Sequence, residues 1–178
     1  AGVKDGETTI GSSATLIRED LKSMMEGTYE KEGLPLGIPT LDAHLPDGLV
    51  GGTVTVIAAP TSVGKSQLAL NIALKNCVQS RLAGGIFSYE MLSKQLTKRI
   101  LRTTSGVDLR KFLERQATSA EQVAVEASIK KLEDTIVLTD HRHKSVDSMC
   151  AVARQWKRKY GIKILVIDYL QRMDAPKG

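Results

Sequence analysis

One short loop constrains this chain more than any other feature. Residues 59–66 read Ala-Pro-Thr-Ser-Val-Gly-Lys-Ser, between an apolar β-branched run and a helical pattern at residues 67–74. A small-residue loop ending in Gly-Lys-Ser between a strand and a helix is the context of a phosphate-binding loop. Its amides and the helix N-terminus face one point, where a polyphosphate can settle. The sequence therefore predicts a nucleoside triphosphate site built from Ala59, Pro60, Thr61, Ser62, Val63, Gly64, Lys65 and Ser66.

The residue types in this loop suggest separate roles. We expect Lys65 to reach the β- and γ-phosphates and the Ser66 hydroxyl to bind Mg²⁺. Ala59 stands where a glycine is usual, so the match to the pattern is imperfect. The alternative is that Gly64-Lys65-Ser66 forms only a tight turn, because short motifs produce false matches.

Composition limits the other classes of function. The chain has 178 residues, of which 42% are hydrophobic and 25% charged, as expected of one globular domain. Its apolar stretches are strand-sized, so the sequence predicts neither a membrane span nor a signal peptide. The net charge of +5 permits a polyanionic partner, but aromatic residues make up only 4%, which does not indicate a base-stacking platform. Cys77 and Cys150 are expected to be buried thiols of a reducing compartment.

The chain divides into three regions by its pattern. Residues 1–11 are Gly-rich and polar and are predicted to be disordered. Residues 12–36 are predicted to form a helix, capped by Ser12 or Ser13 and ended by Gly27, followed by a linker. The apolar stripe of this helix must pack on its own domain or on a neighbouring subunit, and the residues alone favour neither. Residues 37–178 are predicted to form the main domain.

Strand and helix patterns alternate through the main domain. This alternation predicts an α/β fold in which a parallel sheet lies between helices. The expected strands are 53–59, 85–89, 135–139 and 163–168, and the expected helices are 65–79, 92–104, 119–133 and 145–160, with a further short helical piece at 108–112.

Two carboxylates follow apolar strands and complete the predicted site. Asp168 ends the run Ile164–Ile167, so it should emerge beside the phosphate loop and act on Mg²⁺ through bound water. Its alternative role is to cap the next turn. Glu90 follows the strand predicted at 85–89 and could serve as the general base that activates water. Its alternative role is to cap the helix that follows.

Two basic clusters are weaker candidates. The run His141-Arg142-His143-Lys144 lacks the further ligands that a zinc site needs and is interpreted as a solvated loop. The basic residues at 154–159 are interpreted as a solvated helix face, with nucleic-acid contact as the minority alternative.

Several segments together resemble the RecA-like ATPase domain of DnaB-type replicative helicases. They are Gly-Ile-Pro-Thr-Leu-Asp at 37–42, the phosphate loop, Phe-Ser-Tyr-Glu-Met at 87–91, Gly-Val-Asp-Leu-Arg-Lys at 106–111 and Ile-Asp-Tyr-Leu-Gln at 167–171. The Ser-x-Glu-Met and Asp-Tyr-Leu-Gln strings are more specific than the phosphate loop, which many NTPases share. The similarity extends from about residue 12 to residue 178, and an alanine that opens the loop is familiar in this family.

The resemblance implies a RecA-like P-loop NTPase core preceded by a linker helix that docks on the adjacent subunit. It implies that Lys65 and Ser66 bind ATP and Mg²⁺, that Glu90 is the catalytic base and that Asp168 is the Walker B carboxylate. It further implies a homo-hexameric ring in the cytoplasm of a bacterial or phage-infected cell, with single-stranded DNA as its track and no membrane. Primase and a helicase loader are further candidate partners.

The sequence also departs from the family pattern. The family's ATPase domain continues with a γ-phosphate-sensing glutamine, DNA-contacting loops and a basic segment that acts across the subunit interface. We expect this chain to be incomplete on its C-terminal side for that reason. Two rival interpretations are a RecA-fold ATPase of recombination or protein remodelling and a non-catalytic nucleotide-binding regulator. The Asp-Tyr-Leu-Gln string weighs against the first, and the presence of both Glu90 and Asp168 weighs against the second.

Overall fold

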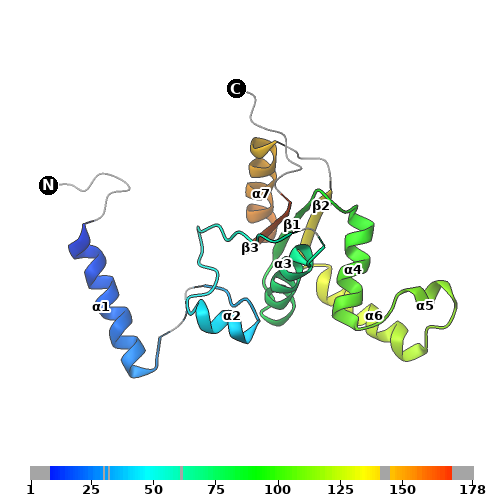
Figure 1. Ribbon diagram of the computed structural model, residues 1–178, viewed down its shortest axis with the longest axis horizontal. Helices are drawn as coiled ribbons and strands as arrows, with labels where there is room; N and C mark the ends of the chain where they lie inside the picture. The colour runs from blue at the N-terminus through cyan, green and yellow to red at the C-terminus, as the bar shows by residue number, and fades with distance from the viewer. Residues whose placement is uncertain (1–8, 30, 32, 61, 141–144, 170–178) are drawn as a thin grey trace.

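The computed structural model describes residues 9–29, 31, 33–60, 62–140 and 145–169 (Figure 1). Three strands, β1 (Gly84–Ser88), β2 (Ile136–Asp140) and β3 (Ile164–Asp168), form a parallel sheet in the order β2-β1-β3. The helices are α1 (Ile10–Glu26), α2 (Pro39–His44), α3 (Lys65–Leu74), a π-helical turn η1 (Lys75–Gln79), α4 (Ser93–Ser105), α5 (Arg110–Leu113), α6 (Ser119–Leu132) and α7 (Val146–Tyr160).

Helices cover both faces of the sheet, as the sequence predicted. On one face, Ile86 of β1 packs among side chains of α3, α4 and α6: Leu70, Leu74, Leu96, Ile100 and Leu132. On the other face, Phe87 packs against α7, and the ring centroids of Phe87 and Trp156 are 4.8 Å apart. All residues of the central strand β1 are buried. The prediction of an α/β fold with a parallel sheet between helices is therefore confirmed.

A glycine allows α7 to approach the sheet closely. A Cβ atom placed on Gly85 would lie 2.9 Å from both the Trp156 ring and Cδ1 of Leu165. Such a distance is too short for real side chains, so any larger residue would displace the helix or the neighbouring strand. Gly85 thus fixes the spacing between the sheet and α7.

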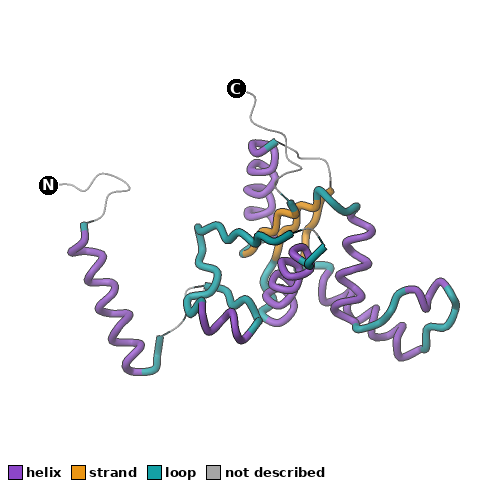
Figure 2. Tube along the Cα trace, in the orientation of Figure 1, coloured by secondary structure: helices purple, strands orange, loops and turns teal. Residues whose placement is uncertain are grey.

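Residues 53–59 were predicted to form a strand, and that prediction is wrong for this structure. The segment is an unpaired loop (Figure 2), and the side chains of Val54 and Val56 are 88% and 71% exposed. Within the described residues β3 pairs only with β1, so no neighbouring strand accepts the segment. A β-branched run favours a strand only where a neighbour completes the hydrogen-bond ladder.

The first helix begins earlier than predicted. Thr9, rather than Ser12 or Ser13, is the N-cap: its hydroxyl accepts the Ser12 N–H, and the Ser12 hydroxyl accepts the Thr9 N–H. This capping box draws Ile10 and Gly11 into α1, so the disorder predicted for residues 1–11 does not hold for them, while residues 1–8 lie outside the described residues. The helix ends at Gly27, as predicted.

The two cysteines differ in burial. Cys77 is 1% exposed, and burial raises the pKa of its thiol to about 11. Cys150 is only half-buried on α7, so the prediction of two buried thiols holds for Cys77 alone. No described helix has the length and apolar character needed to span a bilayer.

Candidate nucleotide site at the carboxyl edge of the sheet

The predicted site residues gather at the carboxyl ends of the parallel strands. β1 ends at Ser88, directly opposite Asp140 of β2 on one side and Asp168 of β3 on the other. These three residues form a polar row, which we call the strand-end row. α3, which begins immediately after the 59–66 loop, lies against β3. The parallel topology therefore brings residues that are distant in sequence to one edge.

The loop turns into α3 at a glycine. Gly64 is the N-cap of α3 with a φ of +99°, a value in the left-handed region that L side chains rarely adopt. Having no side chain, Gly64 cannot cap the helix, and the first amides of a helix have no partner within it. The start of α3 thus has the chemistry of an anion site. Thr61 lies outside the described residues, and Ser62, Val63 and Gly64 are exposed.

Lys65 folds back over the loop. Its Nζ donates a hydrogen bond of 2.7 Å to the carbonyl oxygen of Ala59, the first residue of the motif. The ammonium group is therefore held above the loop, where its single positive charge would meet an incoming polyanion. An exchange of the Ala59 carbonyl for a phosphate oxygen would turn this contact into a charge-assisted one.

Ser66 and Asp168 meet between α3 and β3. The Ser66 hydroxyl donates to Oδ1 of Asp168 at 3.0 Å, and both side chains are half-buried. A hydroxyl and a carboxylate side by side supply the oxygen ligands that Mg²⁺ prefers. The donor set therefore fits the ion that the sequence predicted at these two residues.

Glu90 lies in the loop that joins β1 to α4. Its side chain is exposed, and the loop is tied to β3 because the Tyr89 N–H donates to the carbonyl oxygen of Asp168 at 2.6 Å. The first amides of α4 are taken by other residues: Asp140 accepts the Ser93 N–H at 2.6 Å, and Gln95 accepts the Leu92 N–H at 3.4 Å. These contacts weigh against the alternative role of Glu90 as the cap of this helix.

Known proteins were compared with the chain once this geometry was clear. The family model for the DnaB-like helicase C-terminal domain matches residues 33–178. The chain belongs to the DnaB-like helicase C-terminal domain family. It is 28% identical over 158 residues to the replicative DNA helicase DnaB of Leifsonia xyli, covering 86% of this chain and 34% of the relative. The chain thus spans about a third of the length of that relative.

Two solved structures share its fold. One, an isolated ATPase domain, superimposes with a TM-score of 0.80 at 28% identity, covering 98% of this chain and 61% of that one. The other, a DnaB-like replicative helicase solved in work on its interactions with primase, gives a TM-score of 0.79 at 27% identity, covering 99% and 42%. The predicted RecA-like architecture is therefore confirmed.

Sequence reasoning missed two members of the strand-end row, Ser88 and Asp140. Ser88 is 2% exposed, and its hydroxyl bridges both backbone groups of Met91. Asp140 follows an apolar strand just as Asp168 does, and this signal was available in the sequence. What the sequence could not show is that β2 lies beside β1, so that Asp140 reaches the start of α4.

The weaker basic candidates remain away from this description. Residues 141–144, including both histidines of the cluster, lie outside the described residues. The basic residues of α7 are exposed, in agreement with a solvated face, and Lys157 donates to the Ile162 carbonyl oxygen at 3.0 Å. Nucleic-acid contact by this face stays a prediction.

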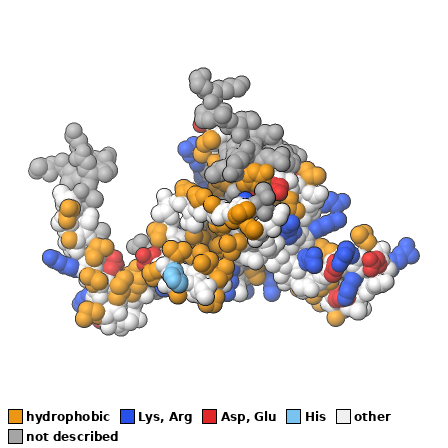
Figure 3. All heavy atoms as spheres, viewed as in Figure 1, with side chains coloured by type: hydrophobic (Ala, Val, Ile, Leu, Met, Phe, Trp, Pro, Cys, Tyr) orange, Lys and Arg blue, Asp and Glu red, His pale blue; other side chains and the backbone are white. Residues whose placement is uncertain are grey.

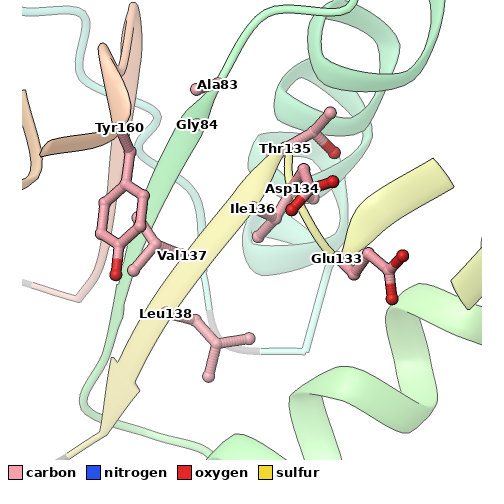
Figure 4. A pocket seen from close by; sticks show the side chains of 9 residues that line it. All are labelled: Ala83, Gly84, Glu133, Asp134, Thr135, Ile136, Val137, Leu138 and Tyr160. Carbon is pink, nitrogen blue, oxygen red and sulfur yellow. The ribbon is translucent and has the colours of Figure 1, made fainter. Parts of the chain in front are cut away.

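A cavity of about 280 Å³ lies at the opposite end of the strands. It is lined by the starts of β1 and β2, the turn before β2 and Tyr160 at the end of α7 (Figure 4). The phosphate loop, Glu90 and Asp168 all belong to the carboxyl edge, far along the strands from this cavity. We therefore place the candidate site at the carboxyl edge.

Proposed function

We propose that this chain is the ATPase part of a replicative DNA helicase motor, which hydrolyses ATP with Mg²⁺ and couples turnover to movement on single-stranded DNA. The observation that carries the proposal is the Ser66–Asp168 hydrogen bond of 3.0 Å beside the loop that ends in Lys65. It joins the two predicted Mg²⁺ residues next to the predicted phosphate site. The names of the Leifsonia xyli relative and of the DnaB-like structural neighbour support the same function.

Each residue has a defined task in this proposal. The amides at the start of α3 and the Lys65 ammonium bind the phosphates of ATP. Ser66 and Asp168 would hold Mg²⁺, with Asp168 acting through bound water; the ion would neutralise charge on the phosphates. Glu90 accepts a proton from the attacking water as the general base. Its exposed position at the carboxyl edge leaves the side chain free to reach a bound nucleotide.

The proposed assembly is a homo-hexameric ring in which α1 docks on the adjacent subunit. Apolar side chains of α1 remain open in this chain: Ile17, Leu21 and Met24 are 55%, 53% and 47% exposed. They line a groove of about 430 Å³ beside Asp47 and Val50 rather than filling it. Figure 3 shows these hydrophobic side chains on the surface of α1. The residue ranges 12–36 and 37–178 are the proposed linker and ATPase domain.

The remaining partners follow from the same proposal. Primase and a helicase loader are proposed partners, and one structural neighbour was itself studied with primase. The cytoplasm of a bacterial or phage-infected cell is the proposed location, and the Leifsonia xyli relative is bacterial.

The test measures ATP hydrolysis and strand displacement by the full-length protein, with and without single-stranded DNA. DNA-stimulated hydrolysis together with strand displacement is the expected result. Stimulated hydrolysis without strand displacement would instead indicate a RecA-fold ATPase of recombination or protein remodelling. Nucleotide binding without hydrolysis would indicate a regulator, and either result would contradict the helicase proposal.

A further inference from the structure

The loop that carries Glu90 is fastened by the strand-end row. Asp168 holds the beginning of the loop through its carbonyl oxygen, which accepts the Tyr89 N–H at 2.6 Å. Ser88 holds its middle, because the Ser88 hydroxyl donates to the Met91 carbonyl oxygen at 2.7 Å and accepts the Met91 N–H at 3.2 Å. Glu90 therefore sits between two fixed backbone points.

Asp140 fixes the far end of the same loop. Its Oδ2 accepts the Ser93 N–H at 2.6 Å, where α4 begins. The N-cap of α4 is Leu92, whose side chain has no oxygen to accept a hydrogen bond, so a residue of the neighbouring strand takes this place. A carboxylate also interacts favourably with the positive end of a helix dipole and forms a strong, charge-assisted hydrogen bond with an amide.

The register explains why Asp140 can act at this distance in sequence. Asp140 lies directly opposite Ser88, and α4 starts shortly after β1 ends. The carboxylate thus spans from the edge strand β2 to the helix that follows the central strand. A displacement of α4 at its first residue would pass along the short loop to Glu90.

We propose that Asp140 is a positioning residue for ATP hydrolysis, which holds the Glu90 loop in its working geometry by anchoring the start of α4. This inference rests on the proposed ATPase function and on Glu90 as its base. Asp140 contacts neither nucleotide nor water in this proposal and acts only through the loop. Its removal is therefore expected to change turnover and to leave nucleotide binding intact.

The first test compares Asp140→Ala and Asp140→Asn in the full-length protein. We expect Asp140→Ala to lower kcat for ATP hydrolysis roughly 10- to 100-fold, because a base displaced by about 1 Å can lose that much rate. The Kd for ATP should stay within about twofold, since Lys65 and Ser66 are untouched. Asp140→Asn keeps an oxygen that can accept the Ser93 N–H and should recover most of the lost turnover.

Thr118→Ala is the matched control. Thr118 caps α6 by accepting the Glu121 N–H at 3.2 Å, on an element that carries none of the proposed site residues. Both alanine variants thus remove a side-chain oxygen from the start of a helix. We expect both to lower the melting temperature, but only Asp140→Ala to lower kcat. Equal kcat values in the two variants would overturn the positioning role.

A double variant tests whether Asp140 acts through Glu90. Single-turnover hydrolysis of radiolabelled ATP should be equally slow in Glu90→Gln and in Glu90→Gln with Asp140→Ala, because a displaced base that is already absent costs nothing more. A further fall of about tenfold in the double variant would overturn the inference. If Asp140→Ala does not fold, Ser88→Ala takes its place, with the same expected loss of kcat and the same contradiction if kcat is unchanged.

The two proposals fail in different ways. An unmodified protein without ATPase activity, or a Glu90→Gln variant with normal turnover, would overturn the proposed function and the positioning role with it. An active unmodified protein, an inactive Glu90→Gln variant and a fully active Asp140→Ala variant would overturn the positioning role alone.

Discussion

The Ser66 hydroxyl donates a hydrogen bond to the Asp168 carboxylate although the two residues are 102 positions apart in the sequence. The first follows the phosphate loop at the start of α3, and the second ends strand β3. Their contact at 3.0 Å brings the two predicted Mg²⁺ residues together without any ligand to organise them. In the proposed ATPase, this part of the site is therefore already arranged before nucleotide binds.

Lys65→Ala should weaken ATP binding. The substitution removes the cation that the loop holds 2.7 Å from the Ala59 carbonyl oxygen, beside the proposed phosphate site. We expect the Kd for ATP to rise at least about tenfold, which corresponds to about 1.4 kcal/mol of binding free energy. Isothermal titration calorimetry with ATP and Mg²⁺ measures this change. Lys130→Ala, on exposed α6, is the control, and an unchanged Kd in Lys65→Ala would refute the phosphate role.

Charge on the open face of α1 should prevent ring assembly. Leu21 and Met24 lie on one face of α1 and are about half exposed, so the double substitution Leu21→Glu with Met24→Glu should leave the subunit folded but place charge in the proposed interface. Analytical ultracentrifugation with ATP and Mg²⁺ should show hexamers for the full-length protein and smaller species for the variant.

The control for assembly is Lys22→Ala, which changes a side chain that is 77% exposed on the opposite side of α1. Circular dichroism establishes that each variant is folded. An undisturbed hexamer in the double variant would show that α1 packs within its own subunit or contributes nothing to assembly.

Gly85→Ala should destabilise the fold. The added Cβ would lie 2.9 Å from the Trp156 ring, and overpacking of this kind typically costs about 1–3 kcal/mol. Urea denaturation followed by the fluorescence of Trp156, the single tryptophan, measures the free energy of unfolding. Gly51→Ala is the control, because no atom lies within 4 Å of its added Cβ. Equal stability of the two variants would mean that α7 does not pack tightly at Gly85.

Local patterns in the sequence were sufficient for most of the architecture. The helical periodicity of residues 119–133 and 145–160 predicts α6 and α7 almost to the residue, because each buries one apolar stripe on the sheet. The apolar run ending in Asp168 predicts β3 for the same reason. Residues 53–59 show the limit: their β-branched side chains meet the local requirement for a strand, but pairing depends on a neighbour that local sequence does not specify.

The candidate site divides in a similar way. The 59–66 loop was readable because all of its groups are consecutive, and the capping box at Thr9 shows that even a consecutive signal can be assigned to the wrong residue. The link from Asp140 to Ser93 spans 47 positions and exists only because β2 pairs with β1. Strand order is set by the packing of the whole sheet, so this contact required the structure.

The most direct test of the ATPase account is the turnover of Glu90→Gln in the full-length protein. The amide keeps the shape of the side chain but cannot accept the proton of the attacking water. We expect the Kd for ATP to stay within about twofold while kcat falls roughly 10²- to 10⁴-fold, as is typical when a general base is removed. Glu126→Gln, on the exposed side of α6, is the control. Turnover by Glu90→Gln at the rate of the unmodified protein would contradict the account.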